Sequence, residues 1–462
     1  MKHLAPFDPA QKTVLQRLIM IQPKEGRALI WAAAYFFFLL LSFYLLRPVR
    51  EAMGIAKGAD KLPWLMTGTM LIMLLANPLY SALVSRMSRR RFIPIVTHFF
   101  SANLGIFLLF FWLAPESGSS TLAYAFYIWL SVFNLFVVSV FWSLMTDVFN
   151  EDQGKRLFGM ISMGGTFGAI VGAACTEAFS RGSWGFKVEP AGLMLIAFFG
   201  LQIAVFCMQR LASHFTLSAS GQEAKEPGPD FMQGVRLIMG SRYLQMICAY
   251  ILLYTITSTF LYLKQADIVA LTFTNSTDRI AAFARIDLWG NVITLLLQLF
   301  VTSRLLRGLG VPGVLLILPA VTVVGFGALA IWPTFAALAI VQVARRGLHY
   351  AVDRPAREIL YISLGPEEKY KSKTFIDTFV YRGGDVLGVW APALLSFLAV
   401  PVSAAAIGTA STWLATGAVL GKLVKQKNHT NATEDASSNT PVAANSEAKQ
   451  WEDKSIVMPE RT

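Results

Sequence analysis

Two five-residue segments of the sequence carry paired arginines and a glutamate beside long apolar runs. They are RPVRE, residues 47–51, and RPARE, residues 354–358. Charged side chains within apolar segments are costly, so they usually face the protein interior or water and mark a substrate or ion path. An arginine guanidinium donates two parallel hydrogen bonds to a phosphate or carboxylate. The two segments therefore indicate that the protein binds an anion.

Other ionisable residues interrupt the apolar runs in the same way. The candidate substrate-binding residues are Arg47, Arg50, Glu51, Arg345, His349, Arg354, Arg357, Glu358 and Arg382. The candidate coupling or charge-pair residues are Glu177, Asp377 and Asp385, and Arg285, Asp287 and Arg346 are further intramembrane charges. Each residue alone has a structural alternative, such as pairing of Arg382 with Asp385. As a set they favour function, because basic residues outnumber acidic ones within 334–360 and structural charge pairs would tend to balance.

The composition predicts a membrane protein. Of 462 residues, 55% are hydrophobic and only 15% are charged, and the mean hydropathy is +0.53. A helix needs about 20 apolar residues to cross a bilayer. About twelve such runs are present, at 28–46, 62–84, 92–114, 121–145, 157–179, 191–208, 242–263, 284–303, 311–331, 334–360, 373–398 and 401–421.

The distribution of basic residues predicts the orientation. Lysines and arginines precede the first run and lie between the second and third and between the eighth and ninth, whereas the loops at 115–120 and near 332 carry none. Because cytoplasmic loops are enriched in basic residues, both termini are expected to be cytoplasmic, in a multi-pass protein of a bacterial inner membrane. This pattern accounts for the net charge of +12 without nucleic acid as a partner.

Landmarks in the first half of the chain recur in the second. The pairs Arg86 and Arg304, Pro94 and Pro312, and Pro115 and Pro333 are each 218 residues apart, and the doublets Gly164-Gly165 and Gly383-Gly384 are 219 apart. We expect an all-α membrane protein with two related six-helix halves. The predicted parts are a cytoplasmic segment 1–25, halves 26–209 and 242–425, a cytoplasmic linker 210–241 and a disordered tail 426–462. This layout resembles the major facilitator superfamily, which implies a central cavity and alternating access.

Features that do not repeat are better candidates for function. Shifted back by 218, RPARE falls on the apolar segment FVVSV at 136–140, so we expect it at membrane depth with Pro355 kinking or breaking the helix. RPVRE is expected at or just inside the outer end of the first helix. Arg345 and Arg346 are neighbours about 100° apart on a helix, so at most one should face the cavity.

Gly164, Gly168 and Gly172 have the four-residue spacing of closely packed helices, as do Gly384 and Gly388.

Two segments resemble the ATP/ADP (nucleotide) translocases of plastids and intracellular bacterial parasites. They are SFYLLRPVREAMG, 42–54, and HYAVDRPAREILYISLGPEEKYKSKTFIDTFVYRGGD, 349–385. The positions that carry the resemblance are Arg50-Glu51, Pro355, Arg357-Glu358, Tyr361, Lys371, Lys373 and Ile376-Asp377. It implies exchange of nucleoside tri- and diphosphates, with Arg50 and Arg357 binding the anion. That family commonly has lysine at these two positions, and Asp385 after the glycine pair also departs from its pattern.

The first hypothesis is therefore a secondary transporter of nucleotides or other phosphorylated anions. The alternatives are a proton-coupled symporter of organic anions or phosphate, working through Asp377, Asp385 or Glu177, and a non-transporting membrane scaffold or sensor. The chain has no G-x-x-x-x-G-K-[ST] segment of an ATP-driven pump and no nucleophile elbow or zinc-binding helix motif. We expect no enzyme activity, no cofactor and no metal. The expected partners are the lipid bilayer and a small anion, and the sequence is compatible with a monomer.

Overall fold

The computed structural model describes residues 25–86, 89–113, 119–149, 151–183, 185–214, 231–362 and 364–438. The described part of the first half contains the helices α2 (Gly26–Gly54), α3 (Leu62–Arg86), α4 (Arg89–Leu113), α5 (Ser119–Val148), α6 (Glu151–Arg181) and α7 (Pro190–His214), with the 3₁₀ turn η2 (Ala59–Lys61) between the first two.

The second half contains more elements because two of its helical segments are interrupted by π-helices. The elements are α8 (Phe231–Gly240), α9 (Arg242–Thr272), α10 (Ser276–Phe300), α11 (Thr302–Ile331), α12 (Phe335–Leu348), η4 (His349–Asp353), α13 (Arg354–Leu360), α14 (Pro366–Phe375), η5 (Ile376–Val380), α15 (Tyr381–Phe397) and α16 (Val402–Ser438). In α12–η4–α13 and in α14–η5–α15 the helical path continues through the π-helix.

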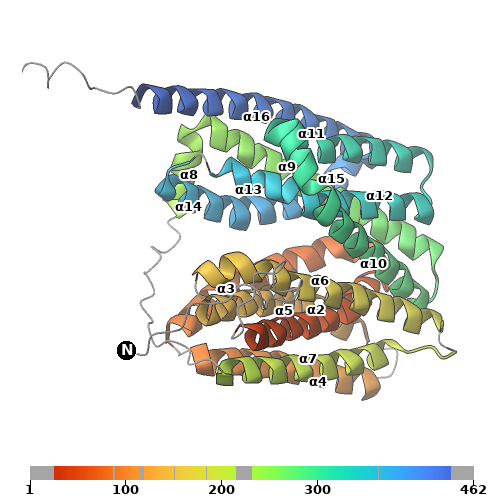
Figure 1. Cartoon of the computed structure of the whole chain (residues 1–462). Coiled ribbons are helices and arrows are strands. Elements are labelled where there is room, and N and C mark those ends of the chain that lie inside the picture. Colours follow the sequence, from red (N-terminus) through yellow and green to blue (C-terminus); the bar gives the residue numbers. More distant parts are fainter. Residues whose placement is uncertain are drawn as a thin grey trace, which may run out of the picture.

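The predicted fold class is confirmed. No strand occurs in the described ranges, and nine of their helices are long and apolar enough to cross a membrane. Six long helices precede the gap at 215–230, and six helical segments follow it when the short α8 is set aside and each π-interrupted segment is taken as one. The bundles formed by the two sets lie one above the other in Figure 1.

Three ends of the predicted parts differ from the ends of the helices. α7 continues to His214 and α8 lies inside the segment predicted as a linker. α16 continues to Ser438, so the start of the predicted disordered tail, 426–438, is helical. Composition suggested disorder there because large apolar residues are nearly absent. Extending an existing helix needs no new nucleus, which explains how such a polar segment continues it. Residues 1–24, 215–230 and 439–462 lie outside the described residues.

The halves are joined through α10. α2 packs on α6 and α7 in the first half, and α9 packs on α15 and α16 in the second. α10 belongs to the second half but leans onto α2 and α6 of the first, as Figure 1 shows on the right of the view. α15 also contacts α3. A few helices near one end of the bundle therefore carry the contacts between the halves.

The glycines spaced four apart on α6 pack directly against the α2 backbone. A Cβ added at Gly164, Gly168 or Gly172 would lie 2.7, 2.2 or 2.6 Å from a main-chain carbonyl oxygen of α2. Gly384 and Gly388 on α15 approach the side chains of Thr255 and Thr259 on α9 closely, and Gly388 also lies near the Ile256 backbone. The prediction that these glycines serve helix packing is confirmed. Small residues allow such close backbone approach in lipid, where apolar surface alone does not drive helices together.

Gly168→Ala should destabilise the protein measurably. Its methyl group would overlap the Phe37 carbonyl, which is backbone and has no alternative rotamer, so α2 and α6 must separate. Overpacking of this kind costs about 1–3 kcal/mol. The measurement is thermal unfolding of purified protein in detergent, with Gly159→Ala as the control, because nothing lies within 4 Å of a Cβ at that α6 position. Equal melting temperatures for the two variants would contradict the packing role.

Candidate functional site

A buried carboxylate on α10 holds one arginine from each half. Arg47 on α2 donates from Nη1 to Oδ1 of Asp287 at 2.8 Å, and Arg346 on α12 donates to the same oxygen. The Asp287 side chain is only 4% exposed. Removing charges from water is costly unless they are paired and hydrogen-bonded, so this carboxylate and its two guanidinium groups stabilise one another.

Further contacts between the halves surround this cluster. On α6, Glu177 accepts from Arg285 Nε of α10 at 2.7 Å and also faces Arg181 at 3.6 Å. Glu51 on α2 accepts from the Tyr262 hydroxyl of α9 at 2.6 Å. All of these contacts lie toward the end of the bundle at which α2 and α9 finish and α10 begins. We call this the closed end, because paired polar side chains hold the halves together there.

The first candidate cavity lies between the halves and measures about 290 Å³. Its lining is Arg50, Met66, Thr69, Met70, Met73, Tyr127, Ser131 and Asn134 from the first half and Ser258, Thr259, Tyr262, Arg382, Asp385 and Val386 from the second. Arg50 donates from Nη1 to Ser131 Oγ at 2.9 Å, contacts the Glu51 carboxylate and lies 4.9 Å from the centre of the Tyr127 ring. Its guanidinium is thus positioned by the first half while it faces the second.

The second candidate cavity lies within the second half and measures about 300 Å³. Its lining is Ile251, His349, Tyr350, Arg354, Arg357, Glu358, Tyr361, Asp377, Tyr381 and Arg382. Three arginines face two carboxylates, so the lining retains an excess of positive charge. Arg382 lines both cavities and lies 3.4 Å from Asp385, and its side chain is 38% exposed.

Both segments that supply the arginines of the second cavity follow a π-helix. η4 ends at Asp353, directly before Arg354, and η5 ends directly before Tyr381 and Arg382. A π-turn inserts one residue into the helical repeat and so changes which side chains face the interior, and it is frequent at functional sites. The helix does not break at Pro355, where a kink or break was predicted: a π-helix lies before the proline, and the backbone at Asp353 and Arg354 stays helical.

A buried network positions Arg357. Asp353, 1% exposed, accepts from the Tyr250 hydroxyl at 2.8 Å and lies 3.2 Å from Arg357 Nε and 3.3 Å from His349 Nδ1. The Tyr254 ring stacks on His349 with centroids 4.3 Å apart and lies 5.4 Å from the Arg357 guanidinium. Arg357 is therefore fixed from one side while it lines the second cavity.

The structure divides the predicted site residues into two groups. Those that line a cavity are Arg50, His349, Arg354, Arg357, Glu358, Asp377, Arg382 and Asp385. Those engaged in contacts outside both cavity linings are Arg47, Glu51, Glu177 and Arg345. Arg345 is buried among Thr257, Thr322 and the Tyr254 carbonyl, while its neighbour Arg346 turns to Asp287, and neither is in the lining of the two cavities described above. A role in substrate binding stays a prediction for every residue of the set.

Several residues of the site were not predicted from the sequence. Asp353 stands four residues before Arg357, a helical spacing that could have identified it as the arginine's partner. Asp287 was recognised as an intramembrane charge, but its two partners were not. Tyr127 and Tyr262, whose hydroxyls are 2.8 Å apart across the halves, carry no signal in the sequence.

Comparison with known proteins identifies the family. The model of the TLC ATP/ADP transporter family matches residues 119–420. The chain belongs to this family. "ADP,ATP carrier protein 1" of Chlamydia trachomatis serovar D is 23% identical over 279 residues, covering 53% of each chain. The protein of the same name from Chlamydia pneumoniae is 22% identical over 298 residues, covering 56% of this chain and 58% of that one. The chain thus spans about half the length of the curated relatives it matches.

Solved transporter structures share the fold of this family member. A POT family peptide transporter matches with a TM-score of 0.60 at 13% identity, over 86% of this chain and 97% of that one. A bacterial homologue of the lysosomal transporter Spinster, in an inward-facing and unoccupied conformation, gives 0.56 at 14% identity, over 88% and 98%. The nucleoside transporter NupG gives 0.54 at 10% identity, over 88% and 99%. At these identities the likeness shows the fold alone, which is the predicted major facilitator-like arrangement of helices.

Proposed function

We propose that the protein is a secondary transporter that exchanges nucleoside phosphates across a bacterial inner membrane by alternating access. The observation that carries the proposal is the position of Arg382, whose side chain lines both the cavity between the halves and the arginine-rich cavity of the second half. Membership of the TLC ATP/ADP transporter family and the names of the Chlamydia relatives support nucleotides as the substrate.

The two cavities suit different parts of a nucleotide. Arg354, Arg357 and Arg382 in the second cavity supply forked donors for phosphate oxygens. The first cavity has Tyr127 and Tyr262 and three methionines, which offer a ring face and adaptable apolar surface for a base. Each cavity is at the lower end of the range for small-molecule pockets, about 300–1,000 Å³. A ligand that extends through both would use Arg382 at the junction.

The orientation follows from the number of passes and the basic loops. Twelve helical passes return the chain to the side on which it started, and the basic loops favour the cytoplasm for that side. The closed end is then the outer one, and a substrate enters from the cytoplasm in this conformation. In alternating access the contacts at the closed end must break before the transporter can open to the outer side.

Uptake into liposomes tests the proposal. Purified protein is reconstituted and uptake of labelled ATP is measured into liposomes preloaded with ADP, with phosphate or with buffer. We expect uptake with ADP inside, unchanged by a proton ionophore, because exchange is driven by the nucleotide gradient. Absence of ATP uptake under every preload would refute nucleotide exchange.

Proton-coupled anion symport is the second candidate, and one observation favours it. Asp385 and Asp377 each place a carboxylate in the lining of a candidate cavity, where a proton could be exchanged together with an anion. Under this alternative the ionophore would abolish uptake, and preloaded ADP would not be required.

A further inference from the structure

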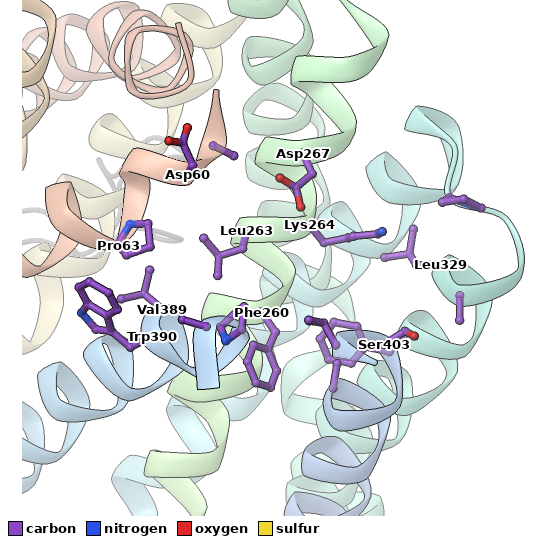
Figure 2. Close-up of a pocket in the computed structure, with 18 of the residues that line it drawn as sticks. Asp60, Pro63, Phe260, Leu263, Lys264, Asp267, Leu329, Val389, Trp390 and Ser403 are labelled. Carbon is purple, nitrogen blue, oxygen red and sulfur yellow. The ribbon is translucent and has the colours of Figure 1, made fainter. Parts of the chain in front are cut away.

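A third cavity, larger than either of the two described above, lies apart from them at the closed end. It measures about 720 Å³ and is shown in Figure 2. Asp60, Pro63 and Trp64 line it from the first half, and side chains of α9, α11, α15 and α16 line it from the second. The proposed transport function uses none of these residues.

The walls of this cavity are mainly apolar. Phe260, Leu329 and Val389 are buried side chains on α9, α11 and α15. Trp390 on α15 meets Trp64 on α3 edge to face, with ring centroids 4.9 Å apart, and Trp64 is 67% exposed. The cavity therefore combines a buried apolar floor with an exposed aromatic edge, which suits an acyl chain.

Charged side chains stand on the rim. Asp60 of η2, Lys264 and Asp267 of α9 are all exposed. In Figure 2 the Asp267 carboxylate lies on the side of Asp60, whereas the Lys264 side chain extends along the cavity toward Leu329. Among the described residues, neither Lys264 nor Asp267 forms an ion pair. Asp60 lies 3.3 Å from Lys61 Nζ in an exposed ion pair, a kind of pair that contributes little free energy and leaves the carboxylate accessible. The two carboxylates and the Lys264 ammonium therefore stand at separate positions on the rim, where a ligand can reach them.

Exposed tryptophans place this rim at the level of lipid headgroups. Trp64 begins α3, Trp112 ends α4 and Trp332 follows α11, and all three helix ends lie at the closed end. Trp112 and Trp332 are 79% and 63% exposed. Tryptophan is enriched at the membrane–water interface, where its ring sits among headgroups. The charged rim therefore faces headgroups and the apolar floor faces the acyl region.

We propose that this cavity binds an aminophospholipid of the phosphatidylethanolamine class. The lipid ammonium lies between Asp60 and Asp267, its phosphate lies at Lys264, and an acyl chain follows Phe260, Leu263 and Leu329. Anionic lipid is disfavoured because two carboxylates face it against one lysine. Phosphatidylcholine has the same charges, but its quaternary ammonium has no N–H to donate to the carboxylates. Because both halves contribute to the rim, bound lipid supports the closed end.

Thermal unfolding with defined lipids tests this inference. The full-length protein in detergent receives dioleoyl-phosphatidylethanolamine, -phosphatidylcholine or -phosphatidylglycerol. A ligand that binds only the folded state stabilises it by mass action, so the ethanolamine lipid should raise the melting temperature by about 2–5 °C and the other two by less. Equal rises with the ethanolamine and choline lipids would overturn the proposal.

Variants of the charged rim residues test where the lipid binds. Asp60→Asn, Lys264→Gln and Asp267→Asn should each remove most of the rise, and native mass spectrometry should show loss of one retained ethanolamine lipid per chain. Glu189→Gln is the control, since Glu189 is an exposed carboxylate in the loop after α6 that does not line this cavity. Retention of the full rise and of the lipid in Asp267→Asn would refute the site. These readouts do not involve nucleotide, so they are independent of the transport proposal.

Discussion

Arg382→Gln is expected to lower ATP uptake by about 30-fold or more. A hydrogen bond to a charged group contributes about 1.5–3 kcal/mol, an arginine can donate two of them to a phosphate, and each 1.4 kcal/mol is a factor of ten. The change removes the guanidinium shared by both cavities and leaves Asp385 facing the anion without its 3.4 Å partner. The measurement is initial uptake in ADP-loaded liposomes at matched protein content.

A double variant separates substrate binding from a structural charge pair. If Arg382 serves only to neutralise Asp385, Arg382→Gln/Asp385→Asn should recover most of the uptake, because no unpaired charge remains. If Arg382 binds phosphate, the double variant stays inactive. Arg304→Gln is the matched control, since Arg304 is exposed and lines neither cavity. Wild-type uptake by Arg382→Gln alone would remove this arginine from the substrate path.

The features that sequence predicted are those set by local composition and spacing. The membrane passes follow from apolar length, and the close contact of α6 with α2 follows from Gly164, Gly168 and Gly172 at helical spacing. The position of RPVRE near the end of the first helix follows from where the apolar run stops, and α2 does end at Gly54. Each inference uses neighbours along the chain, whose relation is fixed by helix geometry.

The features that sequence did not predict depend on which helices pack together. Arg47 and Asp287 are 240 residues apart, and Tyr127 and Tyr262 are 135 apart. Charges within apolar runs identify these arginines and carboxylates as unusual, but packing decides which arginine meets which carboxylate. The same limit explains Arg345, whose burial beside Thr257 and Thr322 satisfies its guanidinium away from the cavities. A charged residue within an apolar run was therefore correctly predicted to lie in the protein interior, but the residue that it pairs with was not predicted.

Asp287→Asn should open the closed end. The neutral amide cannot compensate Arg47 and Arg346, so two partly buried guanidinium groups repel one another across the boundary between the halves. Breaking a buried ion pair costs about 3–5 kcal/mol. Moving an equilibrium between two conformations from 1:99 to 99:1 needs about 5.5 kcal/mol, which is only slightly more. A large part of the population should therefore shift. We expect spin labels at Lys57→Cys and Thr274→Cys, exposed positions of the two halves, to show a longer distance, with the native cysteines replaced by serine.

Two further variants test why the end opens. Asp278→Asn is the control, because that carboxylate is also on α10 but accepts from Asn275, a neighbour in the same half. Arg47→Gln removes the link between the halves but leaves the Arg346–Asp287 pair intact within the second half. It should lengthen the label distance as Asp287→Asn does, yet lower the melting temperature less, since no buried charge loses its partner. An unchanged distance in both Arg47→Gln and Asp287→Asn would show that other contacts, such as Glu177 with Arg285, hold the halves together.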